Sequence, residues 1–288
     1  MKLQNFIKEI VIISIVLISQ GSVGQVPYER ILNASDEPQN WLTYNGGYMS
    51  QRYSLLDQIN RENVNQLELK WVLQNQVFGA WQSNPIIVDG VMYVTERPNS
   101  VMAVDAVTGR VYWKYRHQNA DNALVCCGAN NRGVAVLNDK VYMGTLDAHL
   151  VALDRVNGQL LWEAEVGDVN LAYSVTMAPL AVKDKILVGV GGGEFGIRGY
   201  VAAFNAETGE QAWKTYTIPG PGEANHDSWE GDDWEHGGAP VWITGSFDSD
   251  LNLTYWGVGN PGPDWNAGQR PGDNLYSDSA IALDADTG

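Results

Sequence analysis

The chain has 288 residues, enough for a large hydrophobic core, with 31 glycines, 11 tryptophans and only 18% charged residues. This composition is typical of a folded, turn-rich protein and excludes general disorder. The 34 acidic residues outnumber the 18 basic ones, so the net charge is -16 and no basic stripe is present. Nucleic acid and anionic lipid are therefore not expected as partners.

The first 24 residues have the layout of an export signal. Lys2 and Lys8 provide positive charge, an apolar run follows over 10–18, and small residues precede Gln25. A transmembrane anchor is the alternative, but it needs about 20 apolar residues and this run has about half that number. We therefore predict a signal peptide over 1–24, a mature domain over 25–288 with no membrane span, and a periplasmic location.

One motif recurs along the rest of the chain. Each copy has an apolar strand end, an Asp or Asn, and a turn that closes on Gly, and in the first three copies a Trp follows four residues later. The copies are "AVDAVTGRVYW" (103–113), "ALDRVNGQLLW" (152–162), "AFNAETGEQAW" (203–213) and "ALDADTG" (282–288). The Asp or Asn side chain can bond its own backbone and Gly can adopt positive φ, which predicts a tight turn in each copy. Trp71 in "QLELKWVL" resembles the end of one more unit.

A second hairpin precedes each of the first three copies, with turns at Asp89-Gly90, Asn138-Asp139 and Lys183-Asp184 between β-branched runs. Two hairpins in about 50 residues correspond to four strands, the composition of a propeller blade. The fold class is therefore all-β, a propeller of four-stranded blades with each Trp bridging to the next sheet. A sandwich is the alternative, but the regular spacing of Trp favours blades. Because a propeller closes on itself, we expect this chain to be an N-terminal fragment.

The only two cysteines, Cys126 and Cys127, are adjacent in "ALVCCGANNRG". A bridge between them closes almost no loop, so it would contribute little to stability through the unfolded state. Two free buried thiols are the alternative, but export to an oxidising compartment favours the bridge.

From Trp41 to Gly288 the chain resembles the quinoprotein alcohol dehydrogenases, which carry pyrroloquinoline quinone (PQQ) in an eight-bladed propeller. The resemblance lies in "CCGANNRG", "GTLD", "GGGEFGIRGY", "WEGDDWEHGGAP" and "GNPGPDWN". It implies about half of that propeller in this chain, and it implies that the cysteine pair covers one face of the quinone. The other cofactor contacts that it implies are Arg132, Thr145, Gly192, Gly193, Glu194 and, stacked beneath the quinone, Trp234.

The resemblance also implies a metal ion, Ca²⁺ or a lanthanide, held by Glu194 and Asn260. Oxygen ligands of this kind suit a hard cation. Gln82, in "WQSNPIIVDG", stands where ethanol- and methanol-oxidising relatives often have a cofactor-facing Glu. The implied reaction is oxidation of a small primary alcohol, with electrons passing to a cytochrome c. The family's catalytic aspartate is expected beyond Gly288, so the fragment itself is expected to be inactive.

Three other interpretations are less favoured. A non-catalytic propeller of the outer-membrane assembly type would share the repeats, but it has no need of adjacent cysteines, Glu194 and Trp234 together. Residues 191–196 fit G-x-G-x-x-G, but no βαβ pattern surrounds them, which disfavours nicotinamide binding. The acidic residues and histidines from His226 to His236 lack a recognisable zinc-ligand spacing and indicate a solvated loop.

Overall fold

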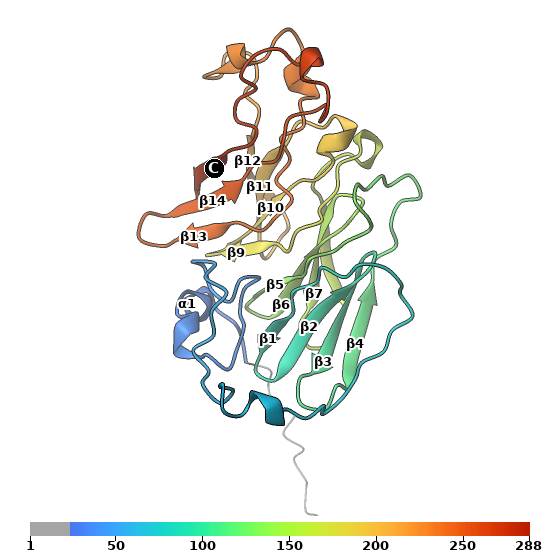
Figure 1. Cartoon of the computed structure of the whole chain (residues 1–288), viewed down its shortest axis with the longest axis vertical. Helices are drawn as coiled ribbons and strands as arrows, with labels where there is room; N and C mark the ends of the chain where they lie inside the picture. The colour runs from blue at the N-terminus through green and yellow to red at the C-terminus, as the bar shows by residue number, and fades with distance from the viewer. Residues whose placement is uncertain (1–23) are drawn as a thin grey trace, which may run out of the picture.

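A computed structural model describes residues 24–288, so the predicted signal peptide lies outside the described residues except for Gly24. Three antiparallel sheets have the strand orders β1-β2-β3-β4, β5-β6-β7-β8 and β9-β10-β11-β12, and a fourth has the order β13-β14-β15. Within each sheet, strands that are consecutive in sequence pair with one another, and the sheets follow one another along the molecule in chain order (Figure 1). The predicted all-β propeller architecture is confirmed, with three described strands in the last sheet.

The strands are short, and their bounds are as follows. The first sheet contains β1 (Ile86–Val88), β2 (Val91–Glu96), β3 (Ser100–Asp105) and β4 (Val111–Arg116). The second contains β5 (Ala135–Leu137), β6 (Lys140–Gly144), β7 (His149–Asp154) and β8 (Leu160–Glu165). The third contains β9 (Leu180–Val182), β10 (Lys185–Gly189), β11 (Tyr200–Asn205) and β12 (Gln211–Tyr216). The fourth contains β13 (Ser246–Asp248), β14 (Leu253–Gly257) and β15 (Ala280–Asp284).

The turn of each motif forms as the sequence predicts. Asp105 Oδ1, for example, accepts hydrogen bonds from the backbone N–H groups of Val107 at 2.9 Å and Thr108 at 3.0 Å. Asp154, Asn205 and Asp284 make the same pair of bonds in their own turns. The glycines that close the turns have φ values of 73–74°. Local backbone chemistry thus explains why the same pattern recurs in this chain.

The motif tryptophans join successive sheets. The indole of Trp113 donates to the carbonyl of Arg155 in the next sheet at 3.1 Å, and its ring lies against Gly158, where an added Cβ would approach it to 2.5 Å. Trp71, Trp162 and Trp213 make the equivalent bonds to Ala106, Ala206 and Ala285. Each turn glycine is therefore needed twice, for its positive φ and for the space that the preceding sheet's indole occupies.

The N-terminal segment packs against every sheet. It includes the only described α-helix, α1 (Tyr28–Leu32), and pairs with the first two sheets at Trp41↔Ile87 and Val26↔Asn138. The hydroxyl of Tyr48 donates to Ala181 O at 2.7 Å, and the Tyr48 carbonyl accepts from Phe247 N at 3.0 Å. Together these contacts tie the third and fourth sheets to the same segment.

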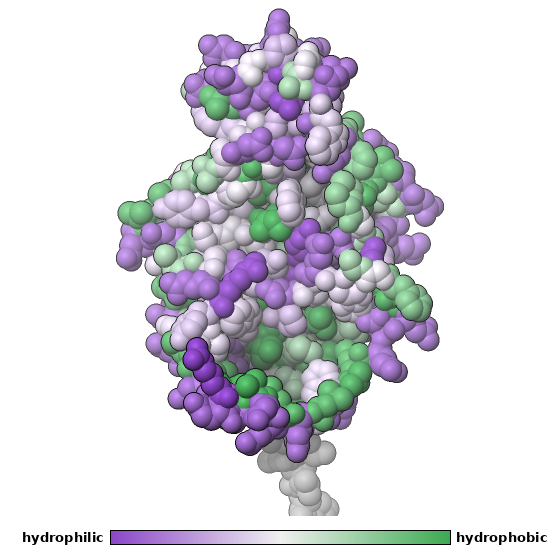
Figure 2. Space-filling model, viewed as in Figure 1, coloured by the Kyte–Doolittle hydropathy of each residue, from purple (hydrophilic) through white to green (hydrophobic). Residues whose placement is uncertain are grey.

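The other helical segments are single 3-10 turns. They are η1 (Ala34–Asp36), η2 (Val64–Gln66), η3 (Val169–Leu171), η4 (Gly193–Phe195), η5 (His226–Ser228), η6 (Asp233–Glu235) and η7 (Ala267–Gln269). Within residues 24–288, no helix has the length and apolar character needed to cross a bilayer. Hydrophilic and hydrophobic residues alternate over the face shown in Figure 2, with a hollow in its lower half that hydrophobic surface partly lines.

Candidate functional site

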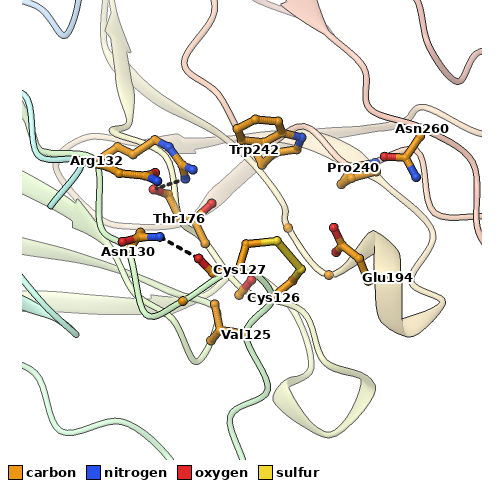
Figure 3. A pocket seen from close by; sticks show the side chains of 15 residues that line it. Val125, Cys126, Cys127, Asn130, Arg132, Thr176, Glu194, Pro240, Trp242 and Asn260 are labelled. Carbon is orange, nitrogen blue, oxygen red and sulfur yellow. Dashed lines mark hydrogen bonds between the residues drawn. A yellow bond between two sulfur atoms is a disulfide. The ribbon is translucent and has the colours of Figure 1, made fainter. Parts of the chain in front are cut away.

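A cavity of about 290 Å³ lies where loops from all four sheets converge. Its walls come from the segment before β1, the cysteine loop before β5, the segments before β9 and after β10, and the segments before β13 and after β14. The side chains that form it are shown in Figure 3. The lining residues are Gln82, Val125, Cys126, Cys127, Gly128, Asn130, Arg132, Ser174, Thr176, Gly191, Gly192, Glu194, Pro240, Trp242 and Asn260.

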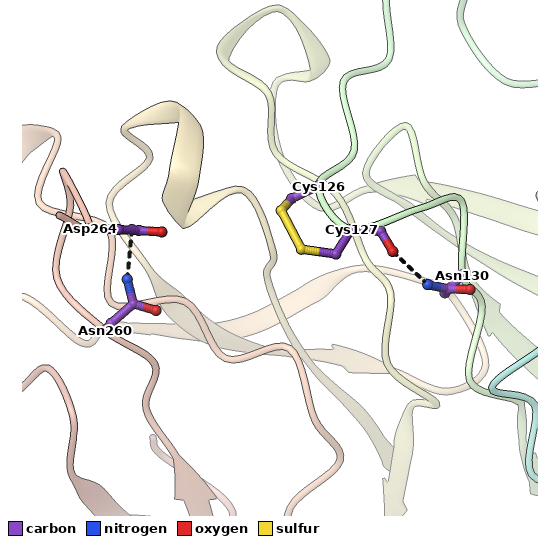
Figure 4. The surroundings of a disulfide bond; sticks show 5 residues. All are labelled: Cys126, Cys127, Asn130, Asn260 and Asp264. Carbon is purple, nitrogen blue, oxygen red and sulfur yellow. Dashed lines mark hydrogen bonds between the residues drawn. A yellow bond between two sulfur atoms is a disulfide. The ribbon is translucent and has the colours of Figure 1, made fainter. Parts of the chain in front are cut away.

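One wall of the cavity is a disulfide between Cys126 and Cys127, which confirms the predicted bridge. The chain turns sharply here, because Cys127 and Gly128 both have positive φ, 64° and 97°. Asn130 Nδ2 donates to the Cys127 carbonyl at 3.0 Å and helps to hold the turn (Figure 4). The result is a rigid sulfur-containing surface facing the cavity.

Trp242 lies across the cavity from the disulfide (Figure 3). The guanidinium of Arg132 stands 5.0 Å from the centre of the Trp242 ring, a cation–π contact, and its Nη1 donates to the Thr176 carbonyl at 3.2 Å. An indole and a disulfide on opposite walls form a slot suited to a flat, polarizable ligand.

Polar groups at one end of the cavity lack partners. Arg132 is half-buried and makes no salt bridge within residues 24–288, and burial lowers the pKa of its guanidinium below the usual range. Thr176 Oγ1 and Asn130 Oδ1 are buried with no hydrogen-bond partner among the described residues. Because buried polar groups are normally satisfied, this end fits a ligand that carries carboxylate or carbonyl oxygens.

Hard oxygen ligands gather at the other end. Glu194 lies in η4, which begins directly after Gly192. Gly192 has a φ of 115°, and its backbone is so close to the Ala172 carbonyl that an added Cβ would stand 2.2 Å from that oxygen. Asn260 donates its amide N–H groups to Asp264 Oδ1 at 2.6 Å and to the Pro261 carbonyl at 3.2 Å (Figure 4). Its amide oxygen is thus left for a ligand, and with the Glu194 carboxylate it can hold a hard cation.

The structure brings most of the predicted site residues together but separates three of them from the cavity. Gln82, Cys126, Cys127, Arg132, Gly192, Glu194 and Asn260 all line it. Gly193 lies behind the lining, where an added Cβ would meet Pro240 Cδ at 2.8 Å. Thr145 and Trp234 do not line it.

The structure places the side chains of Thr145 and Trp234 outside the cavity that the other predicted residues line. Thr145 is fully buried, and its hydroxyl donates to Asp147 Oδ1 at 2.7 Å. The ring of Trp234 lies under the guanidinium of Arg198 at 4.7 Å and beside His226 at 5.8 Å. The hydroxyl and indole that face the cavity belong instead to Thr176 and Trp242, which the sequence analysis missed together with Ser174.

The repeat itself contained a signal for these residues. Gln82, Arg132, Thr176 and Trp242 lie four, three, four and four residues before the first strands of their sheets, which begin at 86, 135, 180 and 246. Equivalent positions in successive sheets therefore point into one cavity. Aligning the hairpins rather than the cysteine and "GGGEFG" motifs would have identified Thr176 and Trp242.

Similarity to known proteins identifies the family of this chain. Residues 41–288 match the sequence family described as glucose/ethanol/alcohol dehydrogenase, beta-propeller domain, named for PQQ. The chain therefore belongs to the PQQ-dependent, or quinoprotein, alcohol dehydrogenases. This membership in a family of enzymes disfavours the non-catalytic scaffold considered from the repeats alone.

The relatives include the quinoprotein alcohol dehydrogenase PedH of Pseudomonas putida, 40% identical over 96% of this chain and 49% of that protein. The lanthanide-dependent methanol dehydrogenase of Methylacidiphilum fumariolicum is 39% identical over 90% of this chain and 46% of that protein. Among solved structures, the quinohemoprotein alcohol dehydrogenase ADHIIG of Pseudomonas putida superposes with a TM-score of 0.87 at 42% identity, covering 92% of this chain and 41% of that one. The chain thus spans half the length of these relatives or slightly less.

Proposed function

We propose that the full-length protein oxidises a small primary alcohol in the periplasm with PQQ and a bound Ca²⁺ or lanthanide ion, and passes the electrons to a cytochrome c. The observation that carries the proposal is the slot between the disulfide and Trp242, with an unpaired cationic end and an oxygen-rich end. Family membership supports the same reaction class. The periplasmic location is supported by the export-type N-terminus and the disulfide.

In this proposal the chain's own residues bind and orient the cofactor. The disulfide of Cys126 and Cys127 and the indole of Trp242 cover its two faces, while Arg132, Asn130 and Thr176 bond its oxygen atoms. Gln82 and Ser174 add polar groups on the adjoining walls.

Glu194 and Asn260 hold the cation at the opposite end, and Gly192 allows the backbone to approach closely. When bound, PQQ supplies the quinone carbonyl that accepts the hydride, and the cation polarises that carbonyl. The proposal assigns the general base to no residue of this chain.

The test uses full-length protein prepared without cofactor. Adding PQQ with Ca²⁺ or La³⁺ is expected to give stoichiometric quinone absorbance in the parent and to fail in Glu194→Ala, because the variant lacks the charged oxygen ligand. Glu230→Ala, which removes an exposed carboxylate outside the cavity, is the matched control. Stoichiometric PQQ and cation in Glu194→Ala would refute the assignment.

A further inference from the structure

A second cluster of ligand-type side chains lies between the first two sheets, outside the cavity. It consists of His117, directly after β4, Asp147 in the β6–β7 connection, His149 at the start of β7, and Glu163 in β8. One ring nitrogen of each histidine and a carboxylate oxygen of Glu163 lie within 4.8 Å of one another. None of these four residues lines the cofactor cavity.

The cluster is partly withdrawn from solvent. The side chains of His117 and Asp147 are 7% and 4% exposed, while those of His149 and Glu163 are 29% and 35% exposed. Within residues 24–288, neither Asp147 nor Glu163 forms a salt bridge with a lysine or arginine. Two carboxylates thus face two imidazoles with no fixed cation to balance them.

A further observation points to a ligand at this place. His149 Nδ1 is buried and has no hydrogen-bond partner among the described residues, and it stands 3.7 Å from Asp147 Oδ1. The other ring nitrogen, Nε2, is 3.9 Å from Glu163 Oε1. Nε2 is thus the ring nitrogen that an ion shared with Glu163 would use, while Nδ1 faces the Asp147 carboxylate, the arrangement of a ligating imidazole with a supporting carboxylate.

Asp147 is placed to orient the histidines. Its Oδ1 lies 3.0 Å from His117 Nε2, and it also accepts from the hydroxyl of Thr145 at 2.7 Å. Its Oδ2 accepts from the backbone of Ala120 at 2.9 Å. A carboxylate that fixes ligating imidazoles is the usual support of a histidine metal site.

We propose that His117, His149 and Glu163 bind one divalent transition-metal ion of the zinc type, with Asp147 as the positioning carboxylate. Imidazole nitrogen and carboxylate oxygen bind zinc at about 2.0–2.2 Å, which sets neighbouring ligand atoms about 3.3–3.5 Å apart. The ligand atoms now lie within 4.8 Å of one another, so metal binding would draw the three side chains closer together. Two nitrogen ligands favour this class over the hard cation proposed at Glu194.

The site also has a structural consequence. His117 begins the irregular segment that runs to Cys126, and Asp147 holds that segment at Ala120. A metal ion bound at His117 would join this segment to β7 and β8 of the next sheet. Metal binding should therefore slow hydrogen exchange over residues 117–125.

The test uses tag-free full-length protein freed of metals, with Co²⁺ as a spectroscopic probe and Zn²⁺ in competition with a chromophoric chelator. One equivalent of Co²⁺ is expected, with the visible absorption of a low-symmetry site that Zn²⁺ removes. His149→Gln and Glu163→Gln should lose this absorption, and Asp147→Asn should weaken metal affinity about 10–100-fold.

His226→Gln is the matched control, because it removes a histidine whose Nδ1 bonds the Pro219 carbonyl far from this cluster in sequence. Glu194→Ala should bind Co²⁺ as the parent does, which separates this site from the proposed cofactor site. If His117→Gln fails to fold, Glu163→Gln still decides the question, since Glu163 lies on a partly exposed strand position. Failure of the parent to bind, or parent-like binding by both His149→Gln and Glu163→Gln, would overturn the proposal and leave a purely structural hydrogen-bond network.

Discussion

The hydroxyl groups of Thr145 and Thr176 have different surroundings. Thr145 Oγ1 donates to Asp147 and accepts from the backbone of His149 at 2.9 Å, so its hydrogen bonds are complete inside the fold. Thr176 Oγ1 is buried in the cavity wall and has no partner within residues 24–288. The first hydroxyl contributes to stability, whereas the second is free for a ligand.

We expect Thr176→Val to weaken PQQ binding about tenfold, since it removes one hydrogen bond of about 1–1.5 kcal/mol. The stability of the cofactor-free protein should change little, because no intramolecular bond is lost. Thr145→Val is the matched control and should show the reverse, lower stability with unchanged PQQ affinity. Fluorescence titration with PQQ and urea denaturation measure the two quantities. Weaker PQQ binding by Thr145→Val with unchanged binding by Thr176→Val would show that Thr145, and not Thr176, contacts the cofactor.

Trp242 and Trp234 offer a second matched pair. Trp242→Ala removes the indole that faces the disulfide, so PQQ affinity is expected to fall at least tenfold. Trp234→Ala removes a ring that lies under Arg198, outside the cavity lining, and should leave PQQ affinity within about twofold of the parent. Equilibrium titration of both purified variants decides the matter. Loss of PQQ binding in Trp234→Ala alone would contradict the proposed slot.

Replacing both Cys126 and Cys127 by Ala should depress turnover far more than it lowers the melting temperature. The bridge joins neighbouring residues, so it closes almost no loop in the unfolded chain and contributes little stability by that route. Its surface, however, forms one wall of the cavity. Dye-linked alcohol oxidation and thermal unfolding of the full-length variant are the measurements. A variant with normal turnover and a markedly lower melting temperature would show the bridge to be structural.

At the residue level the sequence predicted the disulfide but not every cavity residue. Cys126 and Cys127 stand out because they are adjacent and alone in the chain. Trp234 and Trp242 are close in sequence, and only the path of the backbone after β12 decides which indole reaches the cavity. Short motifs identify a loop, whereas the direction of a side chain depends on the packing of neighbouring loops.

At the level of elements, the turn motif was the most predictable feature. An Asp or Asn two residues before a backbone donor and a Gly at the turn's end specify the geometry locally. The bond from Trp113 to Arg155 of the next sheet, by contrast, joins residues 42 positions apart. The spacing of Trp suggested that the indole contacts the next sheet, but only the structure identifies Arg155 as the residue that accepts its hydrogen bond.

Gly158→Ala should cost about 2–5 kcal/mol of unfolding free energy. The φ of 73° costs about 1–2 kcal/mol with a Cβ, and the contact at 2.5 Å with the ring of Trp113 adds an overpacking penalty of about 1–3 kcal/mol. Gly222→Ala is the control, because Gly222 has a φ of 85° and nothing within 4 Å of its added Cβ. Gly222→Ala should therefore cost only the positive-φ contribution of about 1–2 kcal/mol. Equal losses in urea denaturation would show that the indole contact is not a constraint.

At the scale of the whole molecule, the N-terminal segment holds the sheets together through polar contacts that the sequence did not predict. Arg30, in α1, donates through Nε to Glu37 Oε1 at 2.7 Å and through Nη1 to Asp89 Oδ2 at 2.9 Å. Asp89 lies in the turn between β1 and β2. The separation of 59 positions between Arg30 and Asp89 explains why no local pattern indicated this pair.

This network predicts a pH-dependent contribution to stability. The Arg30 guanidinium lowers the pKa of Glu37, so the carboxylate stabilises the fold above its unfolded pKa of about 4.3, and that stability is lost as the pH falls through the lower folded value. Glu37→Gln should therefore lower the unfolding free energy by about 1–2 kcal/mol at neutral pH. The deficit should shrink toward zero in acid, because the parent carboxyl is then protonated in both states.

Urea denaturation of both proteins from neutral to acidic pH measures this deficit. Glu62→Gln serves as the control, since Glu62 is exposed and its side chain forms no ion pair among residues 24–288, and it should match the parent throughout. A deficit for Glu37→Gln that stays constant as the pH falls would show that the amide disturbs packing rather than the charge pair. A deficit that disappears in acid would instead show that the part-buried ion pair of Arg30 and Glu37 stabilises the N-terminal segment.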